Sequence, residues 1–310
     1  MKLLACLALL VLTAPALAPY DPGQLFSGYQ YAPPMRPHVV DDDGSWRAPF
    51  AYAVRMEDPL ERRYSQDRAT RISSFAGPQP WFLLGSDALG RDVLSRLLIG
   101  ARLSLGIALL AAILSIAIGA IVGGIAGYAG GWADEALMRL ADFVTVLPGI
   151  YVVLALRGVL PLVLSPADVF VALVAVLALV GWPVIARGVR TILRVERQAE
   201  YAEAARACGA GPWRLLARHL LPATRGFLGV QATVLVPAFV MAEATLSFVG
   251  LGFAPPTPSW GVMLRDAAAV RVAADVPWLL APAAAIVATV FAINAADGFR
   301  DRREGVARSI

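Results

Sequence analysis

Six apolar runs divide this chain, and one long polar segment separates the first run from the second. A helix needs about 20 apolar residues to cross the hydrocarbon core of a membrane. The first run is shorter than that, with about 16 residues, whereas the next four exceed it. The pattern predicts an all-α polytopic membrane protein with about six transmembrane helices. The runs lie near residues 3–18, 103–128, 143–164, 169–189, 226–251 and 278–296.

The first run, residues 1–18 with its preceding Lys2, allows two interpretations. It is a first transmembrane helix, or it is a signal-like anchor, because Ala16-Leu17-Ala18 resembles a signal-peptidase site. Pro19 directly after that site disfavours cleavage, so we expect an uncleaved first span. Either interpretation leaves the following segment outside the cytoplasm.

Residues 19–100 are rich in proline, aspartate, arginine and tyrosine and contain no run long enough to span a membrane. They predict a long periplasmic segment with a few short strands, ending in an amphipathic helix over 87–100 in which Asp87 caps the first turn. We expect this helix to lie on the membrane surface; alternatively, it forms the first turns of the next span. Its apolar face would carry Leu89, Val93, Leu94, Leu97 and Leu98, and its polar face Arg91, Asp92, Ser95 and Arg96.

Arginines gather in two places, the loop 190–225 and the tail 299–310. Basic residues in short loops favour the cytoplasmic side. Six spans put both places and the N-terminus on that side, so the count and the charge rule agree. The sequence thus predicts a transmembrane domain over 101–298 with cytoplasmic termini and with the loop 252–277 outside.

The composition narrows the possible functions. The chain is 58% hydrophobic and 16% charged, which is more apolar than soluble domains, and its arginines form no stripe typical of nucleic-acid binding. Lys2 is the only lysine, so a P-loop, which needs a lysine after its glycines, is excluded. We therefore expect no ATP-hydrolysing site, no cofactor and no metal in this chain. His38 and His219 are too few for a histidine metal site, and Cys6 and Cys208 too far apart for a disulfide.

Four glycines in the second run, Gly119, Gly123, Gly127 and Gly131, recur at every fourth position. Such spacing makes a flat helix face that another backbone can approach closely. We expect a packing seam, either inside the bundle or against a partner subunit; generic enrichment of glycine in membrane helices is the alternative.

The stretch 200–222 predicts two short helices with a break. An Ala/Glu/Arg-rich first part favours a helix, Gly209 suits its stop, Pro212 suits the first turn of a second helix, and Pro222 should end that helix. The second helix would have Trp213, Leu216, Ala217 and Leu220 on its apolar side, with Arg214 and Arg218 beside it. These residues suit either a docking knob for a cytoplasmic partner or an ordinary interfacial loop.

Several motifs in order resemble one protein family. Glu203-Ala204-Ala205, Gly209 and Leu221-Pro222 resemble the EAA loop of bacterial ABC importer permeases, and Arg218-His219 before Leu-Pro is similar to the dipeptide/oligopeptide/nickel branch. The stretches Gly85–Arg96, Gly127–Asp134, Glu243–Gly252, Pro255–Gly261 and Asp297–Asp301 resemble the same branch. The resemblance covers about residues 80–301.

This resemblance implies a permease subunit of an ATP-driven importer that moves di- or oligopeptides across the bacterial inner membrane. Its implied partners are a second permease subunit, two cytoplasmic ATPase subunits that bind ATP and Mg²⁺, and a periplasmic substrate-binding protein. The ATPase-docking residues would be Glu203, Ala204, Ala205, Gly209, Arg214, Arg218, Leu221 and Pro222.

Glu243 and Ser247 lie late in the fifth apolar run, where a carboxylate is costly and often functional. They would line the pathway, or pack through an interhelical hydrogen bond. The chain offers few other intramembrane charges, which disfavours an ATP-independent secondary transporter, and it lacks a nucleophile motif for a membrane enzyme. Nickel chelates and other small solutes remain alternative cargoes.

Overall fold

The computed structural model describes residues 2–41, 44–58, 63–149, 151–152, 154–155, 165–268 and 274–307. The chain divides into two compact units. The helical unit consists of Met1–Ala8, Leu105–Glu243 and Thr289–Ile310. The sheet unit consists of Leu9–Ser104 and Ala244–Ala288, so the strands share a unit with the ends of several helices.

Four helices within the described residues are long and apolar enough to cross a membrane. A shorter apolar helix, Cys6–Leu17, lies within α1 (Lys2–Leu17). The chain is thus a mainly helical, polytopic protein, as predicted. Half of the expected third span, 143–164, falls outside the described residues, so the count of six remains a prediction. The four long helical stretches are Val93–Ala129, Pro166–Glu196, Pro212–Phe248 and Pro277–Ala295.

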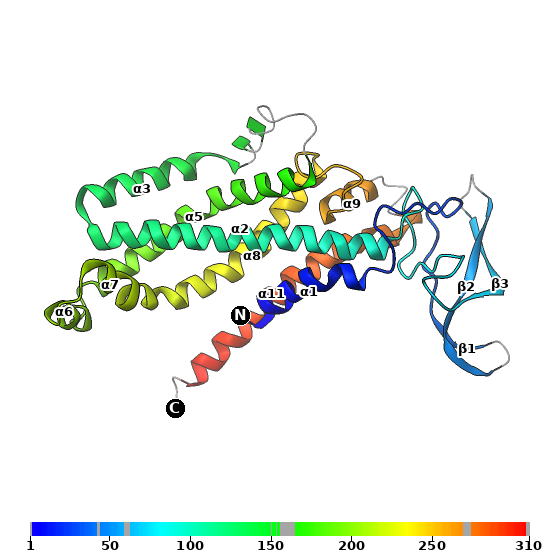
Figure 1. Ribbon diagram of the computed structural model, residues 1–310, viewed down its shortest axis with the longest axis horizontal. Coiled ribbons are helices and arrows are strands. Elements are labelled where there is room, and N and C mark those ends of the chain that lie inside the picture. Colours follow the sequence, from blue (N-terminus) through cyan, green and yellow to red (C-terminus); the bar gives the residue numbers. More distant parts are fainter. Residues whose placement is uncertain are drawn as a thin grey trace. The chain divides into compact units, whose positions relative to one another are not determined.

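Helix α5 (Pro166–Glu196) is the central element of the helical unit, and Figure 1 shows it beside α2 (Val93–Ala129) and α3 (Gly131–Val146). Local sequence features explain where α5 begins. Ser165 is the N-cap and accepts a hydrogen bond from Asp168 N at 3.2 Å, while Pro166 occupies the first turn, where no amide donor is needed. At 31 residues it is about 46 Å long, more than the hydrocarbon core of about 30 Å. Its last turns therefore extend beyond the hydrocarbon.

The glycine seam joins α2 to α5. A Cβ atom on Gly119 would collide with Ile185, one on Gly123 with the Ala186 backbone, and one on Gly127 with Arg190 and Leu193. Gly131 differs: it starts α3 with φ +56° and has nothing within 4 Å of a built Cβ. It therefore forms part of the turn between α2 and α3 and does not belong to the seam.

Glycines on α5 itself serve the same purpose toward another helix. Gly188 faces the ring of Phe227, and Gly181 faces Phe239 and Ser115. Both phenylalanines belong to α8 (Arg225–Phe248). Small residues thus let α2 and α8 approach α5 closely, and van der Waals contact is the main force between helices in lipid.

Helix α3 begins at Gly131, well before the apolar run expected from residue 143. It carries charges that hide it from a hydropathy pattern. Two of them are paired across to α5: Asp142 accepts from Arg187 at 2.7 Å, and Asp134 is held by two further arginines. Pairing lets a helix with charged residues pack beside an apolar neighbour.

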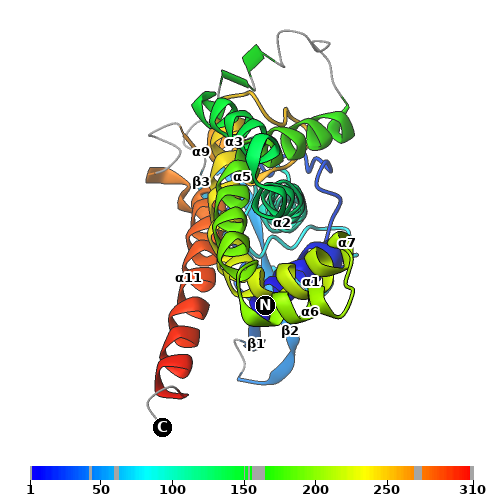
Figure 2. The same ribbon diagram turned by 90° about the vertical axis from the view of Figure 1, so that its left-hand side faces the viewer.

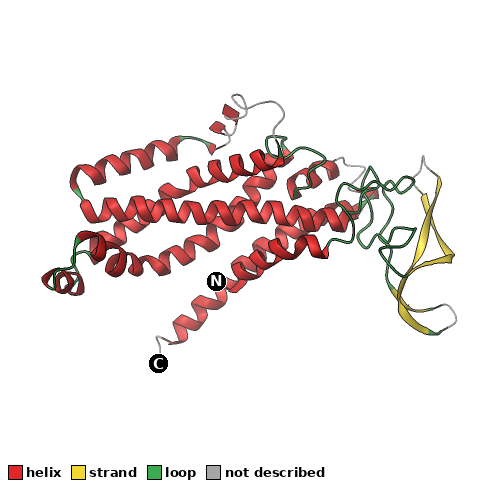
Figure 3. Ribbon diagram, viewed as in Figure 1, coloured by secondary structure: helices red, strands yellow, loops and turns green. Residues whose placement is uncertain are grey.

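The sheet unit contains a three-stranded antiparallel sheet in the order β1–β2–β3 (yellow in Figure 3), in the segment where the sequence predicts a few short strands within an otherwise all-α protein. The strands are β1 (His38–Val40), β2 (Trp46–Asp58) and β3 (Arg63–Ile72). β2 has 13 residues and is not the short strand expected. Residues Phe50–Val54 are buried, and Ala51, Ala53 and Val54 pack into a core with Trp81, Phe82 and Met35. Polar neighbours on both sides of this stretch obscured a segment whose burial depends on the loop around Phe82.

The amphipathic helix expected over 87–100 is also corrected. The helix begins at Val93 and continues without a break to Ala129, so residues 93–100 are the first turns of the span. Asp92, not Asp87, caps it, because Asp92 Oδ2 accepts from Ser95 N at 2.7 Å. The polar face predicted to meet water is buried, including Arg91, Asp92, Ser95 and Arg96.

The remaining elements of the sheet unit are short. Helix α9 (Trp260–Ala267) precedes the 3₁₀ turn η3 (Pro277–Leu280), which leads into α11 (Ala281–Ala307). An apolar cluster joins α9 to the first turn of α2 and to η3 through Val93, Met263, Ala267, Val276 and Leu279.

Candidate functional site

The loop after α5 forms two helical pieces at one end of the helical unit, labelled α6 and α7 in Figure 2. α6 spans Glu200–Ala207 and α7 spans Pro212–Leu215. Gly209 stops α6 as predicted: its φ is +81°, Ala210 N donates to Ala205 O at 3.0 Å, and Gly209 N donates to Arg206 O at 2.9 Å. This pair of bonds is the Schellman motif, which favours glycine at the left-handed position.

The second helix does not end at Pro222, which corrects the sequence expectation. Pro212 starts α7 as predicted, but a π-helical turn (Leu216–Leu220) and a 3₁₀ turn (Leu221–Thr224) then lead directly into α8. Pro222 sits in the first turn of the 3₁₀ segment, where its missing N–H breaks no helical hydrogen bond. The change of helix type absorbs the proline, so the loop is continuous with the span that follows.

One side of the loop is anchored in the helical unit. Ala202, Leu215, Leu216 and Leu220 are buried in a cluster with Ile185, Val189 and Leu193 of α5. The apolar side therefore differs from the predicted set, since Trp213 is 75% exposed and Ala217 is also exposed. Irregular turns after α7 rotate the side chains, so helical spacing alone could not assign that face.

The opposite side of the loop faces solvent. Ala205, Leu221 and Pro222 are half-buried, next to the anchoring cluster. The chain thus presents small, acidic and basic groups on a surface whose back is fixed to α5. The exposed residues include Glu203, Ala204, Gly209, Trp213, Arg214 and Arg218.

Two arginines fasten the loop to helix ends. Arg197 donates from Nη1 to the carbonyl of Tyr128 near the end of α2, and Arg206 donates from Nη2 to the carbonyl of Arg197 at 2.7 Å. Both bonds satisfy carbonyls that a helix C-terminus leaves without a partner. They border a cavity of about 290 Å³, lined by Tyr128, Ala129, Arg197 and Arg206.

An ion-paired brace joins α3 to α5 in the same unit. Asp134 is buried and accepts from Nε and Nη2 of Arg190, the latter at 2.7 Å, and from Nη2 of Arg194. The hydrogen bonds from Arg190 hold the pKa of the Asp134 carboxyl below its usual range, against the opposing effect of burial, and the charge of Arg194 adds to this lowering. The brace therefore fixes α3 to the last turns of α5, in addition to the contacts that the loop makes with Leu193.

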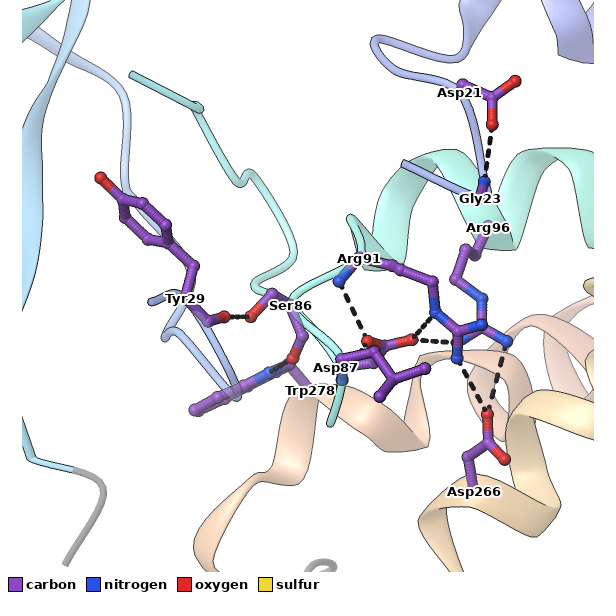
Figure 4. A network of polar contacts seen from close by, with 10 residues as sticks. Asp21, Gly23, Tyr29, Ser86, Asp87, Arg91, Arg96, Asp266 and Trp278 are labelled. Carbon is purple, nitrogen blue, oxygen red and sulfur yellow. Dashed lines mark hydrogen bonds and ion pairs between the residues drawn. The ribbon is translucent and has the colours of Figure 1, made fainter. Parts of the chain in front are cut away.

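A second charged network lies in the sheet unit and is drawn in Figure 4. Asp87 Oδ2 accepts from Arg91 Nε at 2.7 Å and, closely, from Arg96 Nη1. Asp266 of α9 reaches the same two guanidinium groups at 3.7 Å and 3.4 Å. Asp87, Arg91 and Arg96 are almost fully buried, whereas the Asp266 side chain is 28% exposed.

The backbone around this network is held as firmly as its charges. Asp87 Oδ1 accepts from Leu89 N at 2.9 Å and from Arg91 N at 3.0 Å, which shapes the turn before α2. Ser86 accepts at its Oγ from Ala32 N at 2.7 Å, and its carbonyl accepts from Trp278 Nε1 at 3.1 Å. Hydrogen bonds that Ser86 accepts therefore connect the turn before α2 both to Ala32 and to Trp278.

Sequence reasoning missed this network. It assigned Arg91 and Arg96 to a wet helix face and did not select Asp266. The available signal was local: Asp87 and Arg91 are oppositely charged, four residues apart, beside a long apolar run. Residue Asp266 is distant in sequence, so only the fold could bring it to this cluster.

The other predicted residues are placed separately. Glu243 is fully buried in α8. Ser247, in the next turn, is also buried and accepts from Phe253 N at 3.3 Å. Within the described part of the chain, no group of three or more His, Cys, Asp or Glu side chains could hold a metal ion.

Comparison with known proteins identifies the family. Residues 115–303 match the model of binding-protein-dependent transport system inner membrane components. A candidate peptide permease of Brucella ovis is 41% identical over 257 residues, which is 82% of each chain. The glutathione transport system permease protein GsiD of Escherichia coli is 40% identical over 224 residues, 72% of this chain and 71% of that protein.

Among solved structures, a chain of the inward-facing MetNI methionine ABC transporter aligns with a TM-score of 0.48 and 20% identity, covering 67% of this chain and 95% of that one. The family match and the Brucella relative both span most of the present sequence. This chain therefore belongs to the binding-protein-dependent transport system inner membrane components, the multi-pass permease subunits of ABC importers.

Proposed function

We propose that this permease imports di- or oligopeptides across the bacterial inner membrane, driven by separate ATPase subunits that dock on the EAA loop. The cargo assignment is supported by relatives that carry peptide in their names, at 41% identity over 82% of the chain. Two ATPase subunits supply ATP and Mg²⁺ binding, a second, non-identical permease subunit completes the pathway, and a periplasmic binding protein delivers the substrate.

The observation that carries this proposal is the two-sided construction of the loop. Its exposed side includes Glu203, Ala204 and Gly209, while Ala202 and Leu215 on its back are buried against α5. Force applied to the exposed side would therefore reach α5 without loss in a flexible joint. Packed elements with discrete arrangements transmit such motions as rigid bodies.

Each docking residue has a role in this scheme. Ala204 and Ala205 permit close approach, and the groove of the ATPase would receive Gly209. Glu203 accepts hydrogen bonds or pairs with a basic ATPase residue, and Arg214 and Arg218 pair with acidic ones. Leu221 and Pro222 anchor the loop where it joins α8.

The proposed orientation has both termini and the loop 190–225 in the cytoplasm. It is supported by arginines in that loop and in the tail 299–310. The segment 19–100, with its sheet, and the loop 252–277 then lie on the extracytoplasmic side. Glu243 and Ser247, both buried in α8, would contribute to the pathway or to its packing.

The test is Gly209→Asp in the assembled transporter. We expect at least about a tenfold loss of ATPase co-purification and of ATP-driven peptide uptake into proteoliposomes, because a side chain and a charge obstruct the docking surface and about 1.4 kcal/mol suffices for tenfold weaker binding. Gly131→Asp is the matched control, since Gly131 also has positive φ and open space around a built Cβ but lies outside the loop.

Two results would contradict the proposal. One is normal ATPase binding and uptake in Gly209→Asp; the other is an equal loss in Gly131→Asp, which would indicate a general effect of charge or backbone strain. Uptake that runs on an ion gradient without ATP would instead indicate a secondary transporter.

Glutathione-like peptides are a second candidate cargo, because several relatives are named glutathione transport permeases. Competition uptake with a dipeptide, glutathione and a nickel chelate, using the cognate binding protein, separates these classes. Peptide transport is disproved if only the chelate competes.

A further inference from the structure

Helix α9 is held firmly at its first turn. Trp260 N donates to Ser104 Oγ at 3.2 Å, and Trp260 Nε1 donates to the carbonyl of Leu97 at 3.1 Å, so this residue is bonded twice to α2. Ser259 caps the helix by accepting from Val262 N at 3.3 Å. Trp260 is 2% exposed, so water cannot replace these bonds.

The same end is pressed against α8. A Cβ on Gly261 would collide with the carbonyl of Ala244 and the side chain of Ser247. Gly100 on α2 likewise faces the Trp260 ring, with a built Cβ 3.2 Å from Cδ1. The first turn of α9 is thus fixed between two helices by directional bonds and by backbone contact that leaves no free space.

The last turn of α9 is held differently. Asp266 reaches Arg96 at 3.4 Å and Arg91 at 3.7 Å, and both are longer than the 2.7 Å bond between Asp87 and Arg91. Charge-assisted hydrogen bonds are typically about 2.7–2.9 Å. Besides these pairs, Ala267 belongs to an apolar cluster that includes Val93, but apolar contacts lack direction and tolerate sliding.

The charges of the network also allow Asp266 to leave. Each arginine keeps its bond to Asp87 when Asp266 is withdrawn, so neither guanidinium becomes a buried charge without a partner. Asp266 itself is already in contact with solvent, because its side chain is 28% exposed, and its carboxylate would gain hydration on leaving the arginines. Withdrawal of Asp87, by contrast, would leave both arginines facing only the distant Asp266.

We propose that Asp266 is a positioning residue for transport: it holds the last turn of α9 against α2 in the resting state and releases it during the transport cycle, while Trp260 and Gly261 act as the fixed pivot. This inference goes beyond ATPase docking and cargo. It rests on the proposed orientation in one respect, namely that α9 then lies on the extracytoplasmic side, where the pathway must open to the binding protein.

Hydrogen–deuterium exchange on the complete transporter in liposomes tests the pivot directly. Amides of 265–267 should exchange faster after trapping with ATP and vanadate than in the nucleotide-free state, while those of 260–263 stay protected in both. In Asp266→Asn the amides of the last turn should exchange about five- to thirtyfold faster already at rest, a factor that corresponds to about 1–2 kcal/mol of local stability. Asp266→Glu should restore resting protection.

Coupled activity provides a readout that a merely structural role would not move. Asp266→Asn should raise ATP hydrolysis in the absence of binding protein severalfold, with unchanged ATPase co-purification, and Asp266→Glu should lower it again. Equal exchange at both ends of α9, or no change in either exchange or hydrolysis in Asp266→Asn, would overturn the inference. Failure of the docking proposal would instead appear as lost co-purification in Gly209→Asp.

Discussion

Two regions of this permease join helices through an aspartate shared between two arginines, and they differ mainly in burial. In the brace, Asp134 of α3 binds Arg190 and Arg194, whose side chains are 27% and 50% exposed. In the network of the sheet unit, Asp87 binds Arg91 and Arg96, whose side chains are 7% and 1% exposed. The arginines of the brace are therefore partly in contact with water, whereas those of the sheet-unit network are almost completely buried.

The difference in burial predicts how much stability each network loses when one of its members is removed. Ion pairs in water contribute little, because solvent already stabilises both charges. Buried pairs add little net stability when complete, but removing one partner strands the other in a medium that cannot solvate it. The network of Asp87, Arg91 and Arg96 is therefore sensitive to the loss of any one of these three residues, whereas the brace tolerates the loss of Arg194.

Asp87→Asn should produce the largest effect, a loss of about 3–5 kcal/mol in the free energy of unfolding, because two buried arginines lose their close counter-ion. Thermal unfolding of the purified transporter in detergent measures it. Asp21→Asn, an exposed aspartate of the same unit that accepts only from Gly23 N at 2.8 Å, is the control and should be nearly neutral. Equal stability of the two variants would show that the network is not an essential contact.

Asp134→Asn should have an intermediate effect of about 1–3 kcal/mol near pH 7, because charge-assisted bonds to Arg190 and Arg194 are weakened. The pKa of Asp134 is lowered in the folded state, so its contribution is present above its ordinary value of about 3.9 and is lost as the pH falls through the folded value. Melting curves of wild type and variant should therefore differ fully at pH 7 and converge at strongly acidic pH. A difference that grew on acidification would contradict this sign.

Arg194→Ala should have the smallest effect, about 0–1 kcal/mol, because the side chain is 50% exposed and Asp134 keeps both bonds to Arg190. Arg190→Ala is the comparison in the same brace and should destabilise more. Melting temperatures of the two variants test this ranking. The reverse order would mean that exposure is a poor guide to the strength of these pairs.

The EAA loop was largely readable from sequence because local chemistry decides most of its shape. Gly209 stops α6 since its φ of +81° is easy only for glycine, and Pro212 starts α7 since its ring presets the first turn. The face of the second piece was not readable. Leu215 is buried and Trp213 is exposed, because the buried face is decided by packing against Ile185, Val189 and Leu193 of α5.

The glycine seam was likewise predictable in its spacing but not in its partner. Glycine at every fourth position predicted a close helix contact, and Gly119, Gly123 and Gly127 do face α5. The sequence could not say whether the contact is internal or with a partner. Gly131 shares the spacing, but a turn removes it from the face.

The sequence by itself determined that this is a polytopic helical membrane protein with a helix–break–helix loop and without a P-loop, because apolar run length, glycine and proline positions and the single lysine act through local or compositional rules. Only the tertiary structure decided which charges are buried. Asp266 meets Arg91 and Arg96 across more than 160 residues of chain, and burial depends on what packs over a residue, which no periodicity within one helix contains.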